Sequence, residues 1–194
     1  MASQSGTTMS AAPTSRHASP PPGMVAIVFT ILHVASIVIV SIFATNPSYP
    51  TPTTGARDIV AYFQIHTSLV LVGAFLQFGS AISLGIFTAS VASRLRFLGA
   101  RAAGVDIAFL GGLMATLNLA GSACVSWVLT QPGITQDGTL TRALFSLQFV
   151  LGGPGYCVPL GLLVAGVCVF AGFTRLLPKL TLFYLEYILL NREV

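Results

Sequence analysis

Four long apolar stretches limit what this chain can fold into more than any other feature. Each is long enough to cross a bilayer, because a hydrocarbon core of ~30 Å needs about 20 residues of helix. The composition agrees: 54% of the 194 residues are hydrophobic and only 7% are charged, against roughly a quarter in an average soluble domain. The sequence therefore predicts an all-α integral membrane protein, a bundle of four transmembrane helices with the lipid bilayer as its surroundings.

Turn-forming or charged residues separate the predicted spans, which are residues 24–45, 65–91, 104–130 and 143–174 of a membrane domain that covers 24–175. Residues 1–23 are rich in Ser, Thr, Ala and Pro and predict a disordered tail, since they cannot bury enough apolar area to offset the ordering entropy. The first apolar stretch exceeds the usual ~7–15 residues of a signal peptide, so we expect an uncleaved span. Residues 176–194 carry several charges and predict an interfacial segment, or alternatively a short fifth span.

Lysine and arginine are unevenly distributed between the two sides of this topology. With both termini cytoplasmic, seven basic residues lie inside and two outside, the asymmetry that the positive-inside rule predicts. The inside residues are Arg16, Arg94, Arg96, Arg101, Arg175, Lys179 and Arg192, and the outside ones are Arg57 and Arg142. Trp127 and Tyr62 are expected at the outer interface. We therefore predict a multi-pass protein of the cell (inner or plasma) membrane. The small net charge of +4 does not indicate nucleic-acid binding.

Small residues recur at every fourth position of the second and third spans, including Gly85, Gly104, Ala108 and Gly112. Such rows let helix backbones approach closely, which matters in lipid because no hydrophobic force draws helices together there. A row at this spacing drifts about 40° per step around a helix, which suits a crossing. We interpret it as packing between neighbouring spans; the alternative is a homodimer face, which would make the protein a homo-oligomer.

Two amides, Gln77 and Asn118, lie about 20 Å from the inner interface on adjacent spans. At equal depth they could hydrogen-bond to each other, since each amide offers donors and an acceptor. This predicts an interhelical clamp; the alternative is a polar path for a substrate.

Two further polar residues are assigned structural roles. His33 is interpreted as a hydrogen-bonded packing residue, with a proton relay as the alternative. A haem shared with His66 is excluded, because the two histidines lie roughly 15 Å apart in depth. Asp106 opens the third span, where the helix dipole and nearby Arg101 would stabilise its carboxylate.

No motif for catalysis or metal binding is found. The sequence has no Walker lysine motif, no G-x-S-x-G elbow and no H-E-x-x-H. Its cysteines, Cys124, Cys157 and Cys168, lack the spacing of a metal site and are expected to be buried packing residues. We therefore expect a non-enzymatic protein without a cofactor or a metal.

The run Gly152-Gly153-Pro154-Gly155 interrupts the fourth span, which is longer than one crossing needs. It should kink, unwind or end the helix. One hypothesis is a kink that fits an over-long helix into the bilayer, in which case Gly153→Ala should be nearly silent. The other is a broken helix that offers backbone groups to a transported substrate.

Several strings resemble those of an uncharacterised family of bacterial multi-pass inner-membrane proteins, a domain of unknown function. They are Ser93-Arg94-Leu95-Arg96, Gly111-Gly112-Leu113-Met114-Ala115, Gly152-Gly153-Pro154-Gly155, Pro159-Leu160-Gly161-Leu162 and Leu176-Leu177-Pro178-Lys179. The resemblance covers about residues 65–180 and implies a bacterial inner-membrane location without an assigned activity.

Two functions follow. The first is a protein that acts through helix packing with itself or a partner. The alternative is a small-molecule or ion transporter that uses the broken span and the level of Gln77 and Asn118. A water-filled cavity that reaches Gln77, Asn118 and the helix break would favour transport, and a dry, filled bundle would favour the first.

Overall fold

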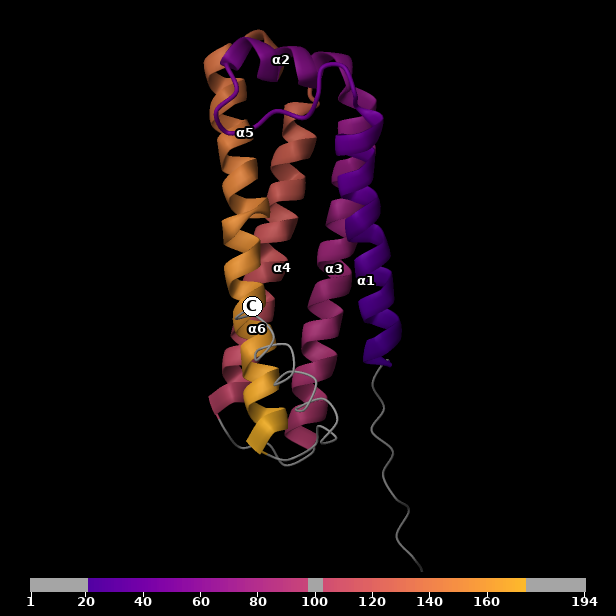
Figure 1. The fold of residues 1–194 in the computed structure, drawn as a ribbon, viewed down its shortest axis with the longest axis vertical. Coiled ribbons are helices and arrows are strands. Elements are labelled where there is room, and N and C mark those ends of the chain that lie inside the picture. Colours follow the sequence, from indigo (N-terminus) through magenta and orange to yellow (C-terminus); the bar gives the residue numbers. More distant parts are fainter. Residues whose placement is uncertain (1–20, 98–102, 174–194) are drawn as a thin grey trace, which may run out of the picture.

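The computed structural model describes residues 21–97 and 103–173, and every element within them is helical. Four helices or helix pairs are long and apolar enough to cross a membrane: Pro22–Phe43, Thr67–Phe97, Ala103–Leu129 and Gly138–Val169 (Figure 1). These are the four predicted spans, so the predicted all-α membrane bundle is confirmed. The predicted interfacial segment 176–194 and nearly all of the predicted tail lie outside the described residues.

The helices follow the expected order along the chain. The spanning elements are α1 (Pro22–Val38) with its π-helical extension η1 (Ile39–Phe43), α3 (Thr67–Phe97), α4 (Ala103–Leu129), α5 (Gly138–Gly152) and α6 (Pro154–Phe173). A short helix, α2 (Ala56–Ile65), precedes α3, and a single 3₁₀ turn, η2 (Ile134–Gln136), precedes α5. The start of α5 has a clear local cause, because the Asp137 carboxylate accepts hydrogen bonds from the backbone N–H groups of Thr139 and Leu140.

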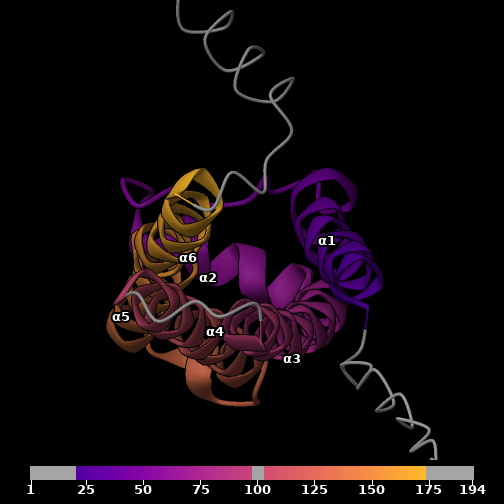
Figure 2. The same cartoon turned by 90° about the horizontal axis from the view of Figure 1, so that it is seen from below.

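Helix α4 lies in the middle of the bundle. It packs against α3 on one side and against α5 and α6 on the other, and α1 packs against α3. Figure 2 shows this arrangement along the bundle axis: α3 and α4 lie side by side, and α1 and α6 stand on the same side of this pair, α1 near α3 and α6 near α4. The first helix begins and α6 ends at the same end of the bundle, as four crossings require. We call this the base end.

The opposite end, called the roof end here, is covered by α2, which lies across the tips of the spanning helices (Figure 1). A buried cluster attaches it to them and includes Ile59, Tyr62 and Phe63 of α2 together with Leu129 and Phe145. The prediction that the Tyr62 ring lies at the lipid interface is therefore wrong. Tyr62 is fully buried, and its hydroxyl donates to the Val40 carbonyl oxygen at 2.7 Å. Tertiary packing of α2 over the bundle removes this ring from the interface.

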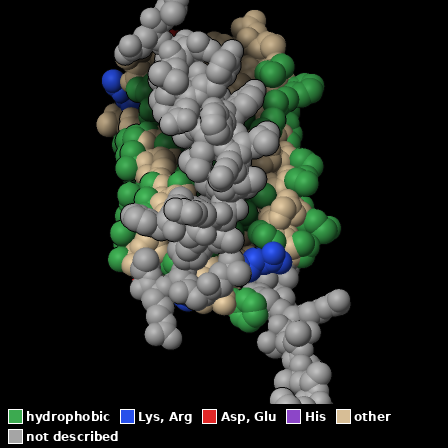
Figure 3. Space-filling view, turned by 60° about the horizontal axis from the view of Figure 1, so that its bottom comes forward, with side chains coloured by type: hydrophobic (Ala, Val, Ile, Leu, Met, Phe, Trp, Pro, Cys, Tyr) green, Lys and Arg blue, Asp and Glu red, His purple; other side chains and the backbone are tan. Residues whose placement is uncertain are grey.

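The flanks of the bundle are apolar (Figure 3). Large side chains such as Ile31, Phe75, Leu117 and Val158 are more than 60% exposed, as expected for a surface that faces lipid. All three cysteines are exposed as well. Their predicted burial is wrong, because a residue that is apolar enough for the core of a soluble protein is equally suited to a lipid-facing position.

Candidate functional site

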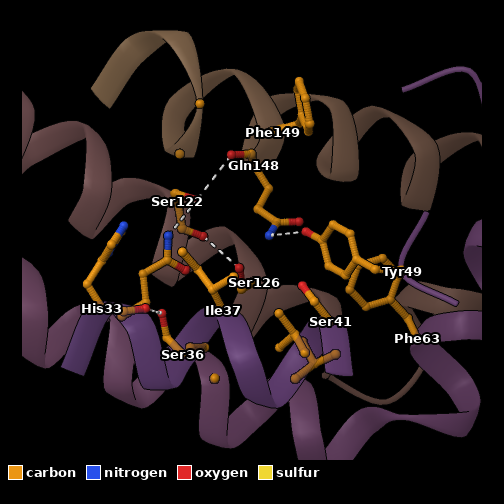
Figure 4. Close-up of a pocket in the computed structure, with 17 residues that line it drawn as sticks. His33, Ser36, Ile37, Ser41, Tyr49, Phe63, Ser122, Ser126, Gln148 and Phe149 are labelled. Carbon is orange, nitrogen blue, oxygen red and sulfur yellow. Dashed lines mark hydrogen bonds between the residues drawn. The ribbon is translucent and has the colours of Figure 1, made fainter. Parts of the chain in front are cut away.

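A cavity of about 240 Å³ lies between α1, α3, α4 and α5 in the roof half of the bundle (Figure 4). At ~30 Å³ per molecule it has room for about eight waters. Nearly half of its lining residues are polar: His33, Ser36, Ser41, Tyr49, Gln77, Ser122, Ser126 and Gln148. The rest of the wall is apolar. Polar side chains at this level of a membrane protein need partners, because unpaired polar groups are costly in hydrocarbon.

Among the residues that the structure describes, the cavity wall carries no ionised acid or base. None of the 17 residues that line it is Asp, Glu, Lys or Arg. Its hydrogen-bonding groups are amides, hydroxyls and one imidazole, which together provide both donors and acceptors. The site is therefore suited to hydrogen bonding and not to ion pairing.

Ser122 connects three helices along one wall of the cavity. Its hydroxyl accepts a hydrogen bond from Gln77 Nε2 at 3.2 Å and donates to the Gln148 carbonyl oxygen at 3.1 Å. The Ser126 hydroxyl donates to the Ser122 carbonyl oxygen at 2.9 Å. The predicted bond between Gln77 and Asn118 is therefore not the one that Gln77 makes. The two amides lie at a similar depth, but they lie on faces of α3 and α4 that do not point toward each other: Gln77 bonds to Ser122 and Asn118 to Gly155.

Asn118 bonds to the interrupted helix instead. Its Nδ2 donates to the Gly155 carbonyl oxygen at 2.7 Å. In a regular helix this carbonyl would accept from the N–H of residue 159, but Pro159 has none. The amide thus replaces the missing helical hydrogen bond. Asn118 does not line the cavity, whereas Gln77 does. The two amides that were expected to act together therefore have separate roles: Gln77 lines the cavity and Asn118 stabilises α6.

The interruption itself is short. Gly153 is the single residue between α5 and α6, and backbone hydrogen bonds continue across it, from Gly153 N to Phe149 O at 2.8 Å and from Cys157 N to Gly153 O at 2.9 Å. Pro154 occupies the first position of α6, where a missing N–H costs least. Gly152 and Gly153 line the cavity.

The expectation that Gly153→Ala would be silent in a simple kink does not fit this geometry. An added Cβ would lie 2.8 Å from the Phe149 carbonyl oxygen, and one at Gly155 would lie 2.8 Å from the Val150 carbonyl oxygen. Alanine would therefore crowd the backbone whether or not a ligand binds, and the substitution does not separate the two hypotheses.

His33 lies at one end of the cavity, away from Tyr49 and Phe63 (Figure 4). Its ring stacks on Phe29 with centroids 5.5 Å apart and contacts Tyr156 of α6 at 5.4 Å. This agrees with the packing part of the prediction. The predicted hydrogen bond is not made by the Nδ1 atom of His33, which is buried without a partner among the described residues. His66 lies in the roof, with Nε2 3.2 Å from the Pro47 carbonyl oxygen.

The roof end of the cavity is bounded by Tyr49. Its hydroxyl accepts a hydrogen bond from Gln148 Nε2 at 3.1 Å, and its ring packs edge-on against Tyr62. Burial raises the pKa of Tyr49, although the hydrogen bond to Gln148 opposes the shift. Burial also raises the pKa of Tyr62, with a smaller contribution from Tyr49. Both phenols therefore stay neutral under ordinary conditions.

The other predicted residues lie in the base half, apart from the cavity. Asp106 pairs with Arg96 at 2.9 Å, and both side chains are more than half exposed, so the pair contributes at most about 1 kcal/mol. The expected partner, Arg101, lies outside the described residues. Arg96 also stands over the Phe109 ring at 5.7 Å.

The row of small residues on α4 packs against helices of the same chain, as expected, but it contacts two of them, α3 and α6, instead of α3 alone. Gly112 lies against Thr88 of α3, and a Cβ at Gly85 would meet Thr116 at 3.3 Å. Gly104 and Ala108 face Gly166 of α6. Because the row drifts around α4, its members reach α3 and α6 in turn.

The sequence interpretation missed several residues of the site. Ser41, Tyr49, Ser126 and Gln148 line the cavity but were not singled out. One signal was present, since Asn118, Ser122 and Ser126 recur at four-residue spacing on α4 and indicate a polar face.

Comparison with known protein families, with curated proteins and with solved structures finds no match for this chain.

Proposed function

We propose that this membrane protein binds a small molecule in the roof-half cavity and carries it across the bilayer. The observation that supports the proposal is the uncharged polar cavity beside the helix interruption. Protein interiors are normally close-packed, so a bundle that served only as a scaffold would be expected to fill this space. Transporters place their binding sites at interrupted helices in the same way.

The contacts at the base end of the cavity are consistent with a site that is closed toward the base. His33 contacts Tyr156 on the base side, and below them the helices are closed by glycine contacts such as Gly112 against Thr88. A carrier needs such a closure on each side in turn, and α2 with Tyr49 covers the roof side. Movement of α1 would separate His33 from Tyr156, because α1 packs mainly against α3.

Action through packing with itself or a partner remains the second hypothesis. Gly85, Gly104, Ala108 and Gly112, the residues considered as a dimer face, lie against other helices of the same chain. A homo-oligomer would therefore have to use another surface, and no specific contact favours it over transport.

We propose a bacterial inner membrane as the location, with both termini in the cytoplasm and the roof end outside. Arg94 and Arg96 lie in the last turn of α3, at the base end, whereas Arg57 and Arg142 lie at the roof end. This charge asymmetry and the family resemblance support the assignment.

Flux in proteoliposomes tests the transport proposal. A panel of labelled ions and small uncharged metabolites is compared for the wild type, Ser41→Phe and Ser146→Phe. Ser41 lines the cavity, so a phenyl group there should fill it. Ser146 is exposed on α5 and does not line the cavity, so it provides a matched control.

We expect at least one solute whose flux falls at least tenfold in Ser41→Phe and is unchanged in Ser146→Phe. Absence of flux for every solute, with folded wild-type protein in the liposomes, would contradict the proposal.

A further inference from the structure

We propose that the occupant of the cavity is an uncharged, ring-bearing molecule with an amide-like polar group. This inference rests on the proposed function and narrows it to one class of ligand. It follows from three properties of the cavity wall: its charge, its unused hydrogen-bonding groups and its aromatic surface.

The charge argument excludes ions. A carboxylate or an ammonium group would lose its hydration in the cavity and find no Asp, Glu, Lys or Arg among the 17 described residues of the wall. The penalty for burying an unpaired ion is several kcal/mol, whereas a neutral amide or hydroxyl needs only hydrogen bonds. Among the lining side chains, only His33 could offset a negative charge, and its ring faces Phe29 and Tyr156 on either side.

The hydrogen-bonding argument selects a group that both donates and accepts. Gln77 uses its amide nitrogen for Ser122, so its carbonyl oxygen can accept from a ligand. Tyr49 accepts from Gln148, so its own O–H can donate. These two side chains come from α3 and the loop before α2, and a primary amide satisfies both kinds of group at once.

The aromatic argument selects a planar ring. Tyr49 and Phe63 lie together at the roof end of the cavity and Phe149 stands beside Gln148 (Figure 4). Aromatic faces and edges favour another ring in stacked or edge-on contact. A volume of about 240 Å³ accommodates one such ring with its substituent.

Benzamide, benzoate and benzylammonium test the class directly, because they have nearly the same shape and differ in charge. Binding of each labelled compound to the full chain in lipid nanodiscs at pH 7 is measured by equilibrium dialysis. Ser41→Phe reports binding in the cavity as distinct from partition into lipid, and Ser146→Phe is the matched control. Thermal unfolding verifies that each variant is folded, and Ser41→Leu replaces Ser41→Phe if the latter is not.

We expect benzamide to bind at least tenfold more tightly than either ion, with the binding lost in Ser41→Phe and kept in Ser146→Phe. Gln77→Leu should weaken benzamide binding about tenfold, and Gln77→Glu should reverse the preference toward benzylammonium, since it adds the missing counter-charge. A preference for benzoate or benzylammonium in the wild type, sensitive to Ser41→Phe, would overturn the ligand class while leaving the cavity as a binding site.

Two other outcomes also decide the question. If none of the three compounds shows binding that is sensitive to Ser41→Phe, the ligand class is wrong. The proposed function fails separately, only if the broader flux panel shows no solute that the cavity variant affects.

Discussion

The two halves of this bundle differ in the contacts that hold their helices together. In the base half, backbones approach at glycines, as where Gly112 of α4 meets Thr88 of α3. In the roof half, Gln77, Ser122 and the Gln148 carbonyl form a hydrogen-bonded chain across three helices. Helices in lipid associate through close packing and interhelical hydrogen bonds, since the hydrophobic effect does not separate them from lipid tails. In the described part of the chain, the polar cavity lies in the hydrogen-bonded half.

Labelling from the two sides of the membrane would establish which half faces outward, and its result is all-or-none. Single cysteines at Arg96 and Gly138, in a chain without Cys124, Cys157 and Cys168, should react from opposite sides in intact and opened cells. Gly138 opens α5 at the roof end and Arg96 lies at the base end. Reaction of both positions with an impermeant maleimide from outside would contradict the four-span topology.

Gly111→Leu should have the largest effect on stability. A Cβ at Gly111 would lie 2.7 Å from the Pro159 carbonyl oxygen and 2.8 Å from the Leu163 backbone nitrogen, and backbone cannot move aside cheaply. We expect a loss of more than about 3 kcal/mol, measured by equilibrium unfolding in mixed micelles.

The control for this prediction is Gly161→Leu on α6, where nothing lies within 4 Å of an added Cβ. Equal stability of the two variants would show that the base half does not depend on close backbone packing.

Gly112→Leu should cost less, about 1 to 3 kcal/mol, because the atoms that it would meet belong to one side chain, Thr88, and not to the backbone of a neighbouring helix. Thr88→Ala makes room at the same contact and should recover part of the loss. This second change is cheap in itself, since Thr88 Oγ1 is buried without a hydrogen-bond partner among the described residues. If Thr88→Ala recovers nothing in the same unfolding assay, the two residues are not in contact.

Asn118→Leu should cost about 1 kcal/mol, because it leaves the Gly155 carbonyl without a partner. Pro159→Ala supplies a backbone N–H for that carbonyl, so Asn118→Leu should cost nearly nothing in the Pro159→Ala background. A double-mutant cycle measures the coupling between the two positions. Additive effects would mean that Asn118 does not replace the bond that Pro159 removes.

The smallest effect is expected at high pH in the roof. Burial raises the pKa of Tyr62 above 10, so its contribution to stability is complete below pH 10 and falls as the pH rises further, because the unfolded chain ionises first. At pH 10.5 the loss should be about 0.8 kcal/mol. Thermal unfolding at pH 9 and 10.5 should show this difference in the wild type and a smaller one in Tyr62→Phe; equal differences would refute it.

Much of the fold could be predicted because a membrane span is a local property. A helix in lipid satisfies its own backbone hydrogen bonds, so apolar length alone located the four spans to within a few residues at most ends. The interruption at Gly153 and Pro154 was equally visible, since proline and glycine act on their own turn. The site was less predictable. Gln77 was recognised, but its partner was wrong, because depth follows from position in a span whereas the direction of a side chain depends on how neighbouring helices rotate.

The sequence by itself determined that this protein lies in a membrane and how many helices of the described residues can cross it. It also determined where the fourth span is interrupted. Each of these properties depends on residues that are close together in the chain. Only the tertiary structure decided that α2 covers one end, that Asn118 supports the helix that Pro159 weakens, and that Ser41, Gln77 and Gln148 surround one space. Those residues are far apart along the chain, and the forces that bring them together are contacts between helices.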